Sequence, residues 1–378
     1  MTVRAMLRPA LLAEYPLTAA RILRRRIHGH RRFEGDAITV CRSIVDACWT
    51  GRYLAASAGH FRQFWTRDLA YSAEALVRLG AGERVRASLA WALDAWAREG
   101  RVTTTIFPGR RPADVFSYGV DSLPLLLHAL RAVDGDDLVR RHADWLGPEL
   151  RRFAGTVLDP ATGLVRDDRR FSTHRDTVRT RSNAYANTMV ALLERTLGET
   201  GWLTPSPIPA GAVERFRAAF LRDGRIVERP DGDEVTGDAI VFPFFLGVLG
   251  AGDGLRAALR AAEEAGLTDP LPMRYSARRD PHAEDPVQRL FVPDYQGTAI
   301  WTSLGAMELA LLRSVDPRAA APGIAAYRAL VERDGTVWEV LDGHDRRLRP
   351  YRGRLGIFLA DEGMLWSAIL ADLFEPPP

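Results

Sequence analysis

The sequence predicts an all-α protein built as an (α/α)6 toroid, in which six inner helices are surrounded by six outer helices. Three observations lead to this fold class. Helical patterns follow one another from about residue 36 onward, whereas strand-like alternation is sparse. The predicted helices alternate between amphipathic segments and segments that are apolar nearly all round. The sequence contains no run of about 18 apolar residues, which is the length that a membrane-spanning helix needs. The apolar helices must therefore be surrounded by protein.

The predicted helices form pairs along the chain. The amphipathic, odd-numbered helices span about residues 37–48, 84–100, 137–153, 212–221, 254–266 and 324–333. The apolar, even-numbered helices begin after Asp68 and then span 122–133, 183–197, 239–249, 298–312 and 362–374. Their starts are spaced too irregularly for a solenoid of identical repeats. An open helical array is the alternative to a closed ring.

Outside these helices, the chain has a basic start and two long loops. Residues 1–35 are predicted to be a basic N-terminal helical appendage, and residues 36–378 a single (α/α)6 domain that would carry any catalysis. We interpret the arginines of residues 24–32 as a solvated helix surface, with contact to an anionic surface as the alternative. The loops span about residues 152–181 and 334–361, and their aromatic residues favour ordered, functional segments.

The composition narrows the possible partners. Hydrophobic residues make up 47% of the 378, which supports a sizeable core, and the formal net charge of +3 gives no reason to expect a nucleic-acid partner. Cys41 and Cys48 would lie about 10 Å apart on one helix, too far for a disulfide. The N-terminal segment lacks a signal-peptide core with a cleavage site, so we expect a cytoplasmic protein with no membrane span.

Polar and aromatic residues precede each apolar helix. The chain reads FWTRD before the second helix, FSYGVDS before the fourth, TRSNAYAN before the sixth, VTGD before the eighth, VPDYQGTAIW before the tenth and FLADEGMLW before the twelfth. In a toroid the inner helices begin at the same end, so these residues would converge on one funnel. Carboxylates and amides bind sugar hydroxyls, and aromatic rings stack on sugar faces. The funnel therefore suits a carbohydrate.

Helix capping is a simpler explanation for each acidic residue taken singly. Asp and Asn are preferred N-caps, and acids are favourable at helix N-termini, which accounts for Asp68, Asp121 or Asp238 alone. Capping does not explain the aromatic residues beside them. The predicted sugar-binding residues are Trp65, Arg67, Tyr118, Asp121, Asn183, Tyr185, Asn187, Asp238, Asp294, Tyr295, Gln296, Trp301, Trp338, Asp361 and Glu362.

Cleavage of a glycosidic bond needs two carboxyl groups, one to protonate the leaving oxygen and one to activate water or attack carbon. We expect Asp68 to be the acid and Glu339, in TVWEVLD, to be the base; a surface loop acid is the alternative for Glu339. A helix N-terminus favours ionised Asp68, whereas a general acid needs a raised pKa. Burial beside Trp65 and other carboxyl groups would have to outweigh the helix effect.

The common motifs of other chemistries are absent from the sequence. It contains no H-E-x-x-H, no glycine-rich phosphate loop, no C-x-x-C and no G-x-S-x-G. The acids of PDGDEV lack the spacing of a full calcium loop, so a turn is the simpler interpretation. We expect no cofactor and no metal.

Three segments resemble motifs of the neutral and alkaline invertase family, in the same order along the chain. FWTRDLAYSAEAL is similar to its V-x-x-R-D-F-x-P-S-A-L segment, YGVDSLPLLLHALR to V-D-S-G-L-W-W-I-I-L-L-R, and VWEVLD to W-P-E-Y-Y-D. DYQGTAIW and ADEGMLW look closer to glucoamylase-like and glycogen-debranching domains of the wider six-hairpin group. The resemblance implies an inverting (α/α)6 glycoside hydrolase with Asp68 as acid, Glu339 as base and Asp121 at a sugar-binding position. Two features differ from the family. Pro124-Leu125-Leu126 replaces the W-W of its V-D-S-G-L-W-W segment, and the arginine-rich loop at Tyr351 diverges from the family pattern, so sucrose specificity is not implied.

The sequence therefore predicts an inverting, exo-acting glycoside hydrolase whose partner is a small α-glucoside or short oligosaccharide. Three alternatives could use the same toroid: a sugar epimerase or isomerase, a lyase acting on uronic acids, and a non-catalytic carbohydrate-binding protein. An epimerase would need histidines at the funnel, where we expect only His60 and His344. The richness in arginine is compatible with the lyase.

Overall fold

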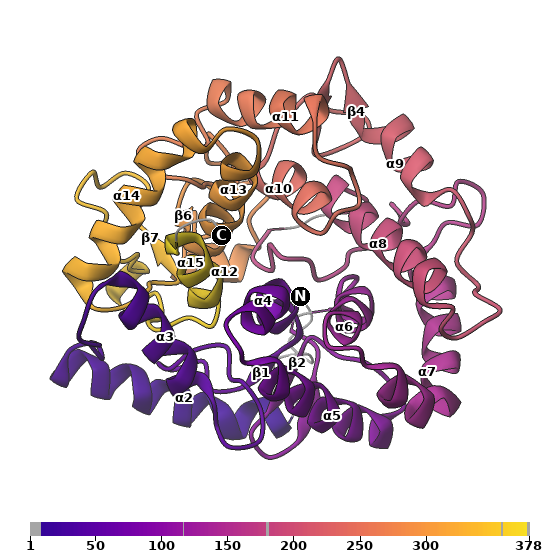
Figure 1. Ribbon diagram of the computed structural model, residues 1–378, viewed down its shortest axis with the longest axis horizontal. Coiled ribbons are helices and arrows are strands. Elements are labelled where there is room, and N and C mark those ends of the chain that lie inside the picture. The colour runs from indigo at the N-terminus through magenta and orange to yellow at the C-terminus, as the bar shows by residue number, and fades with distance from the viewer. Residues whose placement is uncertain (1–8, 116, 179–180, 357, 376–378) are drawn as a thin grey trace.

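Two concentric rings of helices make up the computed structural model, which describes residues 9–115, 117–178, 181–356 and 358–375 (Figure 1). The inner helices are α4 (Thr66–Arg78), α6 (Ser122–Arg131), α8 (Ala184–Thr200), α10 (Gly237–Phe245), α13 (Thr302–Val315) and α15 (Ser367–Phe374). Each inner helix packs against the next, and α15 packs back against α4, which closes the ring. The outer helices are α3 (Ala37–Cys48), α5 (Gly82–Glu99), α7 (Asp136–Val157), α9 (Ala212–Phe220), α11 (Asp253–Glu264) and α14 (Pro317–Asp334). The predicted toroid is confirmed, and the open array is wrong.

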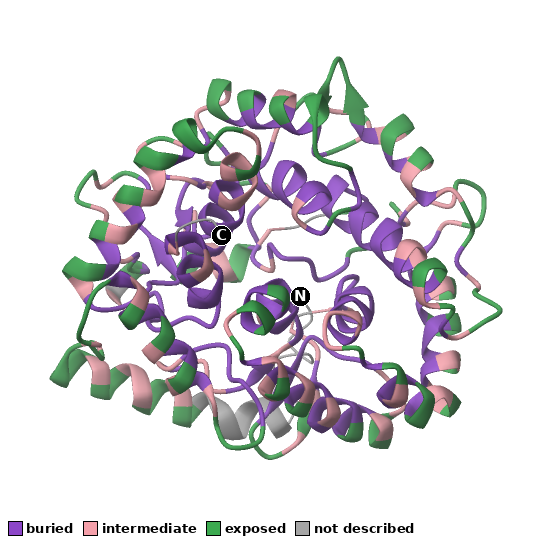
Figure 2. Ribbon diagram, viewed as in Figure 1, coloured by how far each residue is buried: buried purple, intermediate pink, exposed green. Residues whose placement is uncertain are grey.

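Burial follows the two sequence patterns that predict the rings. Every residue of α10 from Gly237 to Phe244 is buried, because ring neighbours and an outer helix cover it on all sides. The outer helix α11 instead buries one stripe, at Leu255, Ala258, Leu259, Ala261 and Ala262, which is the spacing of a single helical face. Figure 2 shows the contrast as a largely buried inner ring inside an outer ring of mixed exposure.

Short elements connect and flank the rings. The additional helices are α2 (Pro9–His28), α12 (Pro286–Phe291) and the 3-10 turn η1 (Arg354–Gly356). The strands are β1 (Phe64–Trp65), β2 (Thr105–Phe107), β3 (Arg111–Ala113), β4 (Leu221–Arg222), β5 (Arg225–Ile226), β6 (Ile300–Trp301) and β7 (Val340–Leu341). They pair antiparallel as β1-β2-β3, β4-β5 and β6-β7. Over the described residues, no helix combines the length and the apolar character that a membrane crossing needs.

Several predicted helix ends need correction. The second predicted helix begins at Thr66 rather than after Asp68, and the last begins at Ser367 rather than at residue 362. The tenth begins at Thr302, because the residues just before it form β6. The first long loop starts after Val157, since α7 continues past residue 152. In each case, local propensity does not reveal where strand pairing or tertiary packing takes over.

Candidate active site

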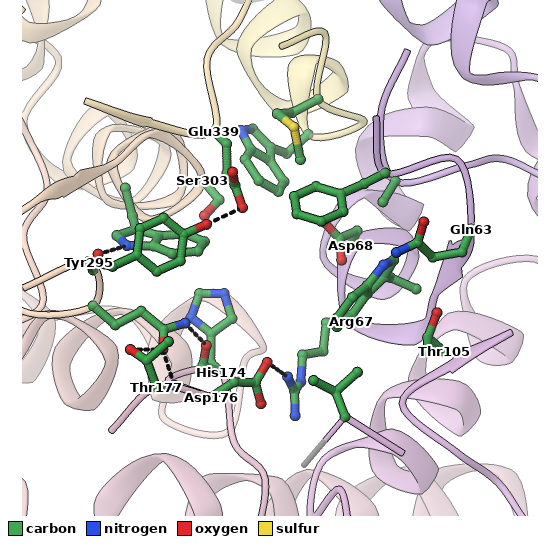
Figure 3. A pocket seen from close by; sticks show the side chains of 18 of the residues that line it. Gln63, Arg67, Asp68, Thr105, His174, Asp176, Thr177, Tyr295, Ser303 and Glu339 are labelled. Atoms are coloured by element: carbon green, nitrogen blue, oxygen red, sulfur yellow. Dashed lines mark hydrogen bonds and ion pairs between the residues drawn. The ribbon is translucent and has the colours of Figure 1, made fainter. Parts of the chain in front are cut away.

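A cavity of about 290 Å³ opens where several inner helices begin (Figure 3). Its walls come from β1 and the first turn of α4, the loop before α8, the segment 288–303 that leads into α13, and the chain before α15. The volume is close to the lower end, about 300 Å³, of pockets that bind small molecules. Seven predicted site residues line the cavity: Trp65, Arg67, Asp68, Tyr295, Gln296, Trp301 and Glu339.

Asp68 is the third residue of α4, so it does not cap the helix. Trp65 occupies the N-cap position, and its pairing opposite Thr105 of β2 fixes the direction in which the chain enters α4. The half-buried Asp68 side chain faces the cavity. Burial, followed by the nearby charge of Glu339, raises the pKa of Asp68 to about 7. Burial therefore outweighs the effect of the helix N-terminus, as a general acid requires.

Glu339 is held in place by its own hydrogen bonds just before β7. The hydroxyl of Tyr295 donates to Oε1 at 2.5 Å, and the backbone N–H of Asp361 donates to Oε2 at 3.0 Å. The Glu339 N–H donates in turn to the carbonyl oxygen of Asp361 at 2.9 Å. Glu339 is 5% exposed, so the surface-loop interpretation is wrong. Burial raises its pKa to about 7, although both donors favour the ionised form.

The two carboxyl groups reach the cavity from different walls. Figure 3 shows Glu339 and Asp68 projecting toward the same open space from distant parts of the chain. Among the described residues, no group of three or more His, Cys, Asp or Glu side chains is arranged to hold a metal ion. The chemistry that this pair supports is proton transfer between carboxyl groups and a ligand.

Arg67 is tied into the cavity wall by acidic partners. Its guanidinium donates to both oxygens of Asp121, at 2.6 and 3.2 Å, and to Asp176 at 2.8 Å. The Tyr185 hydroxyl also donates to Asp121, at 2.6 Å. Asp121 and Tyr185 are predicted sugar contacts, but both lie behind Arg67 and outside the cavity lining. Asp176 does line the cavity, and sequence analysis missed it because it lies in a loop without periodic pattern.

Aromatic rings dominate the remaining wall. Tyr295 and Trp301 pack with ring centroids 5.1 Å apart, and Trp65 also lines the cavity. Further aromatic lining comes from residues outside the predicted set: Phe61, Tyr71, Phe107, Phe358 and Trp366. The Nε1 of Trp65 and the Oγ of Ser303 are buried without a hydrogen-bond partner. Buried polar atoms are normally satisfied, so both are available to a ligand.

The histidine at the cavity is not one that the sequence predicts. His174 lines the cavity, whereas His60 is buried in an ion pair with Asp361 and His344 is largely exposed. The hydroxyl of Tyr275 lies against Nδ1 of His174. Burial, together with nearby arginines, holds the pKa of His174 well below its usual range. The ring is therefore neutral at physiological pH.

Ten predicted site residues lie outside the cavity lining: Tyr118, Asp121, Asn183, Tyr185, Asn187, Asp238, Asp294, Trp338, Asp361 and Glu362. Some of them have structural partners close by. Asn183 is the N-cap of α8, and its side chain accepts a hydrogen bond from a backbone N–H in the first turn. Asn187 accepts from the backbone N–H of Val165 at 2.9 Å, which ties the long loop to α8. Tyr118 packs edge-on against Phe171.

Two further acids stabilise the loops around the cavity. Asp238, in the first turn of α10, forms an ion pair with Arg175 at 3.3 Å. Asp294 has a positive φ of 61° and accepts a hydrogen bond from the backbone N–H of Thr298 at 3.0 Å. It thereby shapes the turn that carries Tyr295 into the cavity.

The N-terminal helix α2 contacts the segment that holds Glu339. Arg25 donates to the carbonyl oxygen of Ala360 at 2.6 Å, pairs with Glu362 at 2.8 Å and lies 5.1 Å from the ring centroid of Trp338. Thr18, also on α2, lines the cavity itself. The predicted appendage thus packs directly on the candidate active site.

Comparisons with known proteins bear on the fold. No protein-family model and no curated protein matches the sequence. A glycosidase variant solved in complex with glucose aligns with a TM-score of 0.60 and 16% identity, over 93% of this chain and 95% of its own. A rhamnosidase from Klebsiella oxytoca with rhamnose bound aligns with a TM-score of 0.60 and 17% identity, over 90% of this chain and 64% of its own. A GH63 mannosylglycerate hydrolase from Thermus thermophilus aligns with a TM-score of 0.55 and 17% identity, over 89% of this chain and 98% of its own. These similarities show a fold shared with glycosidases.

Proposed function

We propose that this protein is a glycoside hydrolase that uses Asp68 as the general acid and Glu339 as the general base. The observation that carries the proposal is the meeting of these two carboxyl groups in one aromatic cavity. The fold supports it, because three proteins that share the fold are a glycosidase, a rhamnosidase and a mannosylglycerate hydrolase. The narrower resemblance to invertases stays a prediction.

The hydrogen bonds around the two carboxyl groups support this division of roles. Glu339 accepts from Tyr295 and from the Asp361 N–H, and both donors stabilise its carboxylate form. None of the described side chains donates a hydrogen bond to Asp68, and the Glu339 charge raises its pKa further. When only one proton is shared between them, it resides on Asp68. Asp68 then holds the proton that a leaving group needs.

The reaction proceeds by a single displacement in this proposal. Asp68 gives its proton to the glycosidic oxygen as the bond to the anomeric carbon breaks. Glu339 removes a proton from a water molecule, whose oxygen attacks that carbon from the opposite face and inverts its configuration. The products are a free sugar and an alcohol, and a second proton exchange with water restores both carboxyl groups.

The cavity favours a small substrate. Its volume of about 290 Å³ and its aromatic walls suit one or two sugar rings with apolar faces. Glucose and rhamnose, which are bound in two of the structural neighbours, are ligands of this size class. We therefore propose that the protein removes a terminal sugar from a small α-glucoside or short oligosaccharide.

Product analysis tests the proposal directly. A panel of aryl glycosides and disaccharides identifies a substrate by the release of reducing sugar, and NMR identifies the first anomer released. An inverted first anomer is expected for at least one α-glycoside. Retention of configuration would overturn the single displacement, and ligand binding without turnover across the panel would identify a carbohydrate-binding protein instead.

One observation favours an epimerase or isomerase as the second candidate. His174 lines the cavity, and such proton transfers commonly use histidine. Its low pKa and its contact with Tyr275 make it a neutral ring with one nitrogen engaged. Conversion of a free sugar without hydrolysis of any glycoside would select this function. The lyase has less support, because Arg67, the one arginine among the described lining residues, already pairs with two carboxylates.

A further inference from the structure

Exposed apolar side chains are concentrated on two helices at the edge of the cavity. Eight large hydrophobic residues are exposed in the described part of the chain, and six of them lie on α2 and α12. The six are Leu17, Leu23, Ile27, Val287, Leu290 and Phe291, with exposed fractions between 41% and 68%. Both helices also border the cavity, to which they contribute Thr18 and Gln288. The exposed apolar surface therefore gathers beside the candidate active site.

Three large apolar residues of α2 are exposed to solvent: Leu17, Leu23 and Ile27. Thr18, Arg21 and Arg25 contact the body of the protein, whereas the three apolar residues keep between 51% and 68% of their surface exposed. The stretch from residue 15 to residue 33 contains six arginines and no acidic residue. Several of these arginines are exposed beside the apolar side chains. The outer face thus combines apolar and cationic groups.

The two helices belong to one continuous rim. The turn at residues 353–356 lies between them: a Cβ built on Gly353 would meet the backbone of Phe291, and one built on Gly356 would lie 3.1 Å from Arg26. Two exposed arginines of this segment, at 352 and 354, add positive charge. The acidic residues at the start of α12, Glu284 and Asp285, are buried. We call α2, α12 and residues 352–356 the docking rim.

We propose that the docking rim binds an anionic lipid surface and holds the cavity next to it. Helices that lie in a bilayer interface have this composition, with leucine or isoleucine buried among the acyl chains and arginines at the headgroups. A second copy of the chain fits the rim less well, because a symmetric contact would bring two clusters of arginines together. The charge of the rim therefore selects an anionic bilayer as its partner.

Vesicle sedimentation of the full-length protein tests this. The protein is expected to sediment with phosphatidylcholine–phosphatidylglycerol vesicles and far less with phosphatidylcholine alone. Raising the NaCl concentration from about 0.1 M to about 0.5 M should weaken binding, because salt screens the arginines. The combined variant Leu17→Asp, Leu23→Asp and Ile27→Asp should lower the vesicle-bound fraction at least about tenfold. Leu290→Asp on α12 should lower it by a smaller factor.

A matched control separates the docking rim from general surface hydrophobicity. Val77 and Leu221 are exposed to 38% and 42% but lie away from the rim, so Val77→Asp with Leu221→Asp should leave binding unchanged. Thermal unfolding checks that each variant is folded, since these side chains are partly covered by the protein. Equal loss in the control, or no binding of the wild type to anionic vesicles, overturns the proposal. So does a dimer in sedimentation equilibrium that the α2 variant converts to a monomer. None of these measurements depends on hydrolysis.

Discussion

The two carboxyl groups of the cavity are supported in different ways. Asp68 sits in the first turn of a helix, beside Trp65, without a side-chain hydrogen-bond donor among the described residues. Glu339 sits in a short extended segment and receives hydrogen bonds from Tyr295 and the Asp361 backbone. Burial is the largest cause that raises the pKa of both groups to about 7. We infer from this difference that burial keeps one proton in the cavity, and that the hydrogen-bond donors determine which of the two carboxyl groups holds it.

The largest expected effect comes from removing either carboxyl group. Asp68→Asn and Glu339→Gln should each lower kcat/KM by about a thousandfold or more, because each variant lacks one of the two carboxyl groups that transfer protons. Hydrolysis of the substrate found in the panel measures this, and circular dichroism checks that both variants fold. Full activity in either variant would remove that residue from the mechanism.

Substrates with different leaving groups separate the two roles. An aryl glycoside whose phenol leaves readily has little need of an acid, so Asp68→Asn should retain much more activity on it than on a disaccharide. Glu339→Gln should be equally impaired on both substrates, because water activation is needed in each case. The reverse pattern would exchange the assignments of acid and base.

A smaller effect is expected from removing one hydrogen bond to Glu339. Tyr295→Phe removes the donor to Oε1 of Glu339, and because that bond lowers the pKa of Glu339, its loss should raise this pKa further. Activity needs ionised Glu339, so it increases as pH rises through this pKa. The acid limb of the kcat/KM–pH profile should therefore move to higher pH, with about a tenfold loss at neutral pH. Tyr71→Phe is the control, because the Tyr71 hydroxyl bonds to Tyr185 instead. An unmoved acid limb in Tyr295→Phe would contradict the role of this donor.

The next prediction concerns the contact between α2 and the chain around Glu339 and Asp361. Arg25 is a positioning residue: it binds the chain on both sides of the Glu339–Asp361 hydrogen bonds. Arg25→Gln leaves Glu362 buried without its cation, and kcat should fall several-fold, by about 3- to 30-fold, with a smaller change in KM. Arg24→Gln is the matched control, since Arg24 is exposed on the same helix. Arg25→Lys should restore part of the loss; equal behaviour of both glutamine variants would exclude the positioning role.

The comparison also explains how far the sequence predicts the site. The sequence pattern selects Asp68 and Glu339 as candidates, since each has a tryptophan close by in the chain, and both line the cavity. Asp121 stands in a similar polar and aromatic run, close to Tyr118 in the sequence, yet its carboxylate binds Arg67. A sequence does not show whether a carboxylate faces a ligand or a cation of its own chain. That choice depends on side chains that are distant in sequence.

The ring architecture is predictable for a different reason from the details of the site. A helix that is apolar on every face must be buried, so local sequence determines the inner and outer rings. His174 and Asp176 lie in a loop that has no periodicity, and only its packing onto α8 and α4 brings them to the cavity. The role of α2 is hidden likewise, because its arginines look solvated until their partners are known.

The smallest expected effect concerns stability rather than rate. The pKa of Asp68 is about 7 in the folded protein and near 4 in the unfolded chain, so between these values the folded state binds more protons. Stability contributed by protonated Asp68 is therefore complete below about pH 4 and is lost as pH rises through 7. Asp68→Asn cannot ionise, so its unfolding temperature relative to wild type should be higher at pH 8 than at pH 4, by about 2–4 °C. Glu308→Gln is a parallel case: burial raises the pKa of Glu308 to about 7, but Glu308 faces a separate crevice between α11, α13 and α14. It should show the same pH trend with hydrolysis intact. A pH-independent difference for Asp68→Asn would mean that this carboxyl group is ionised in the folded protein and is not the acid.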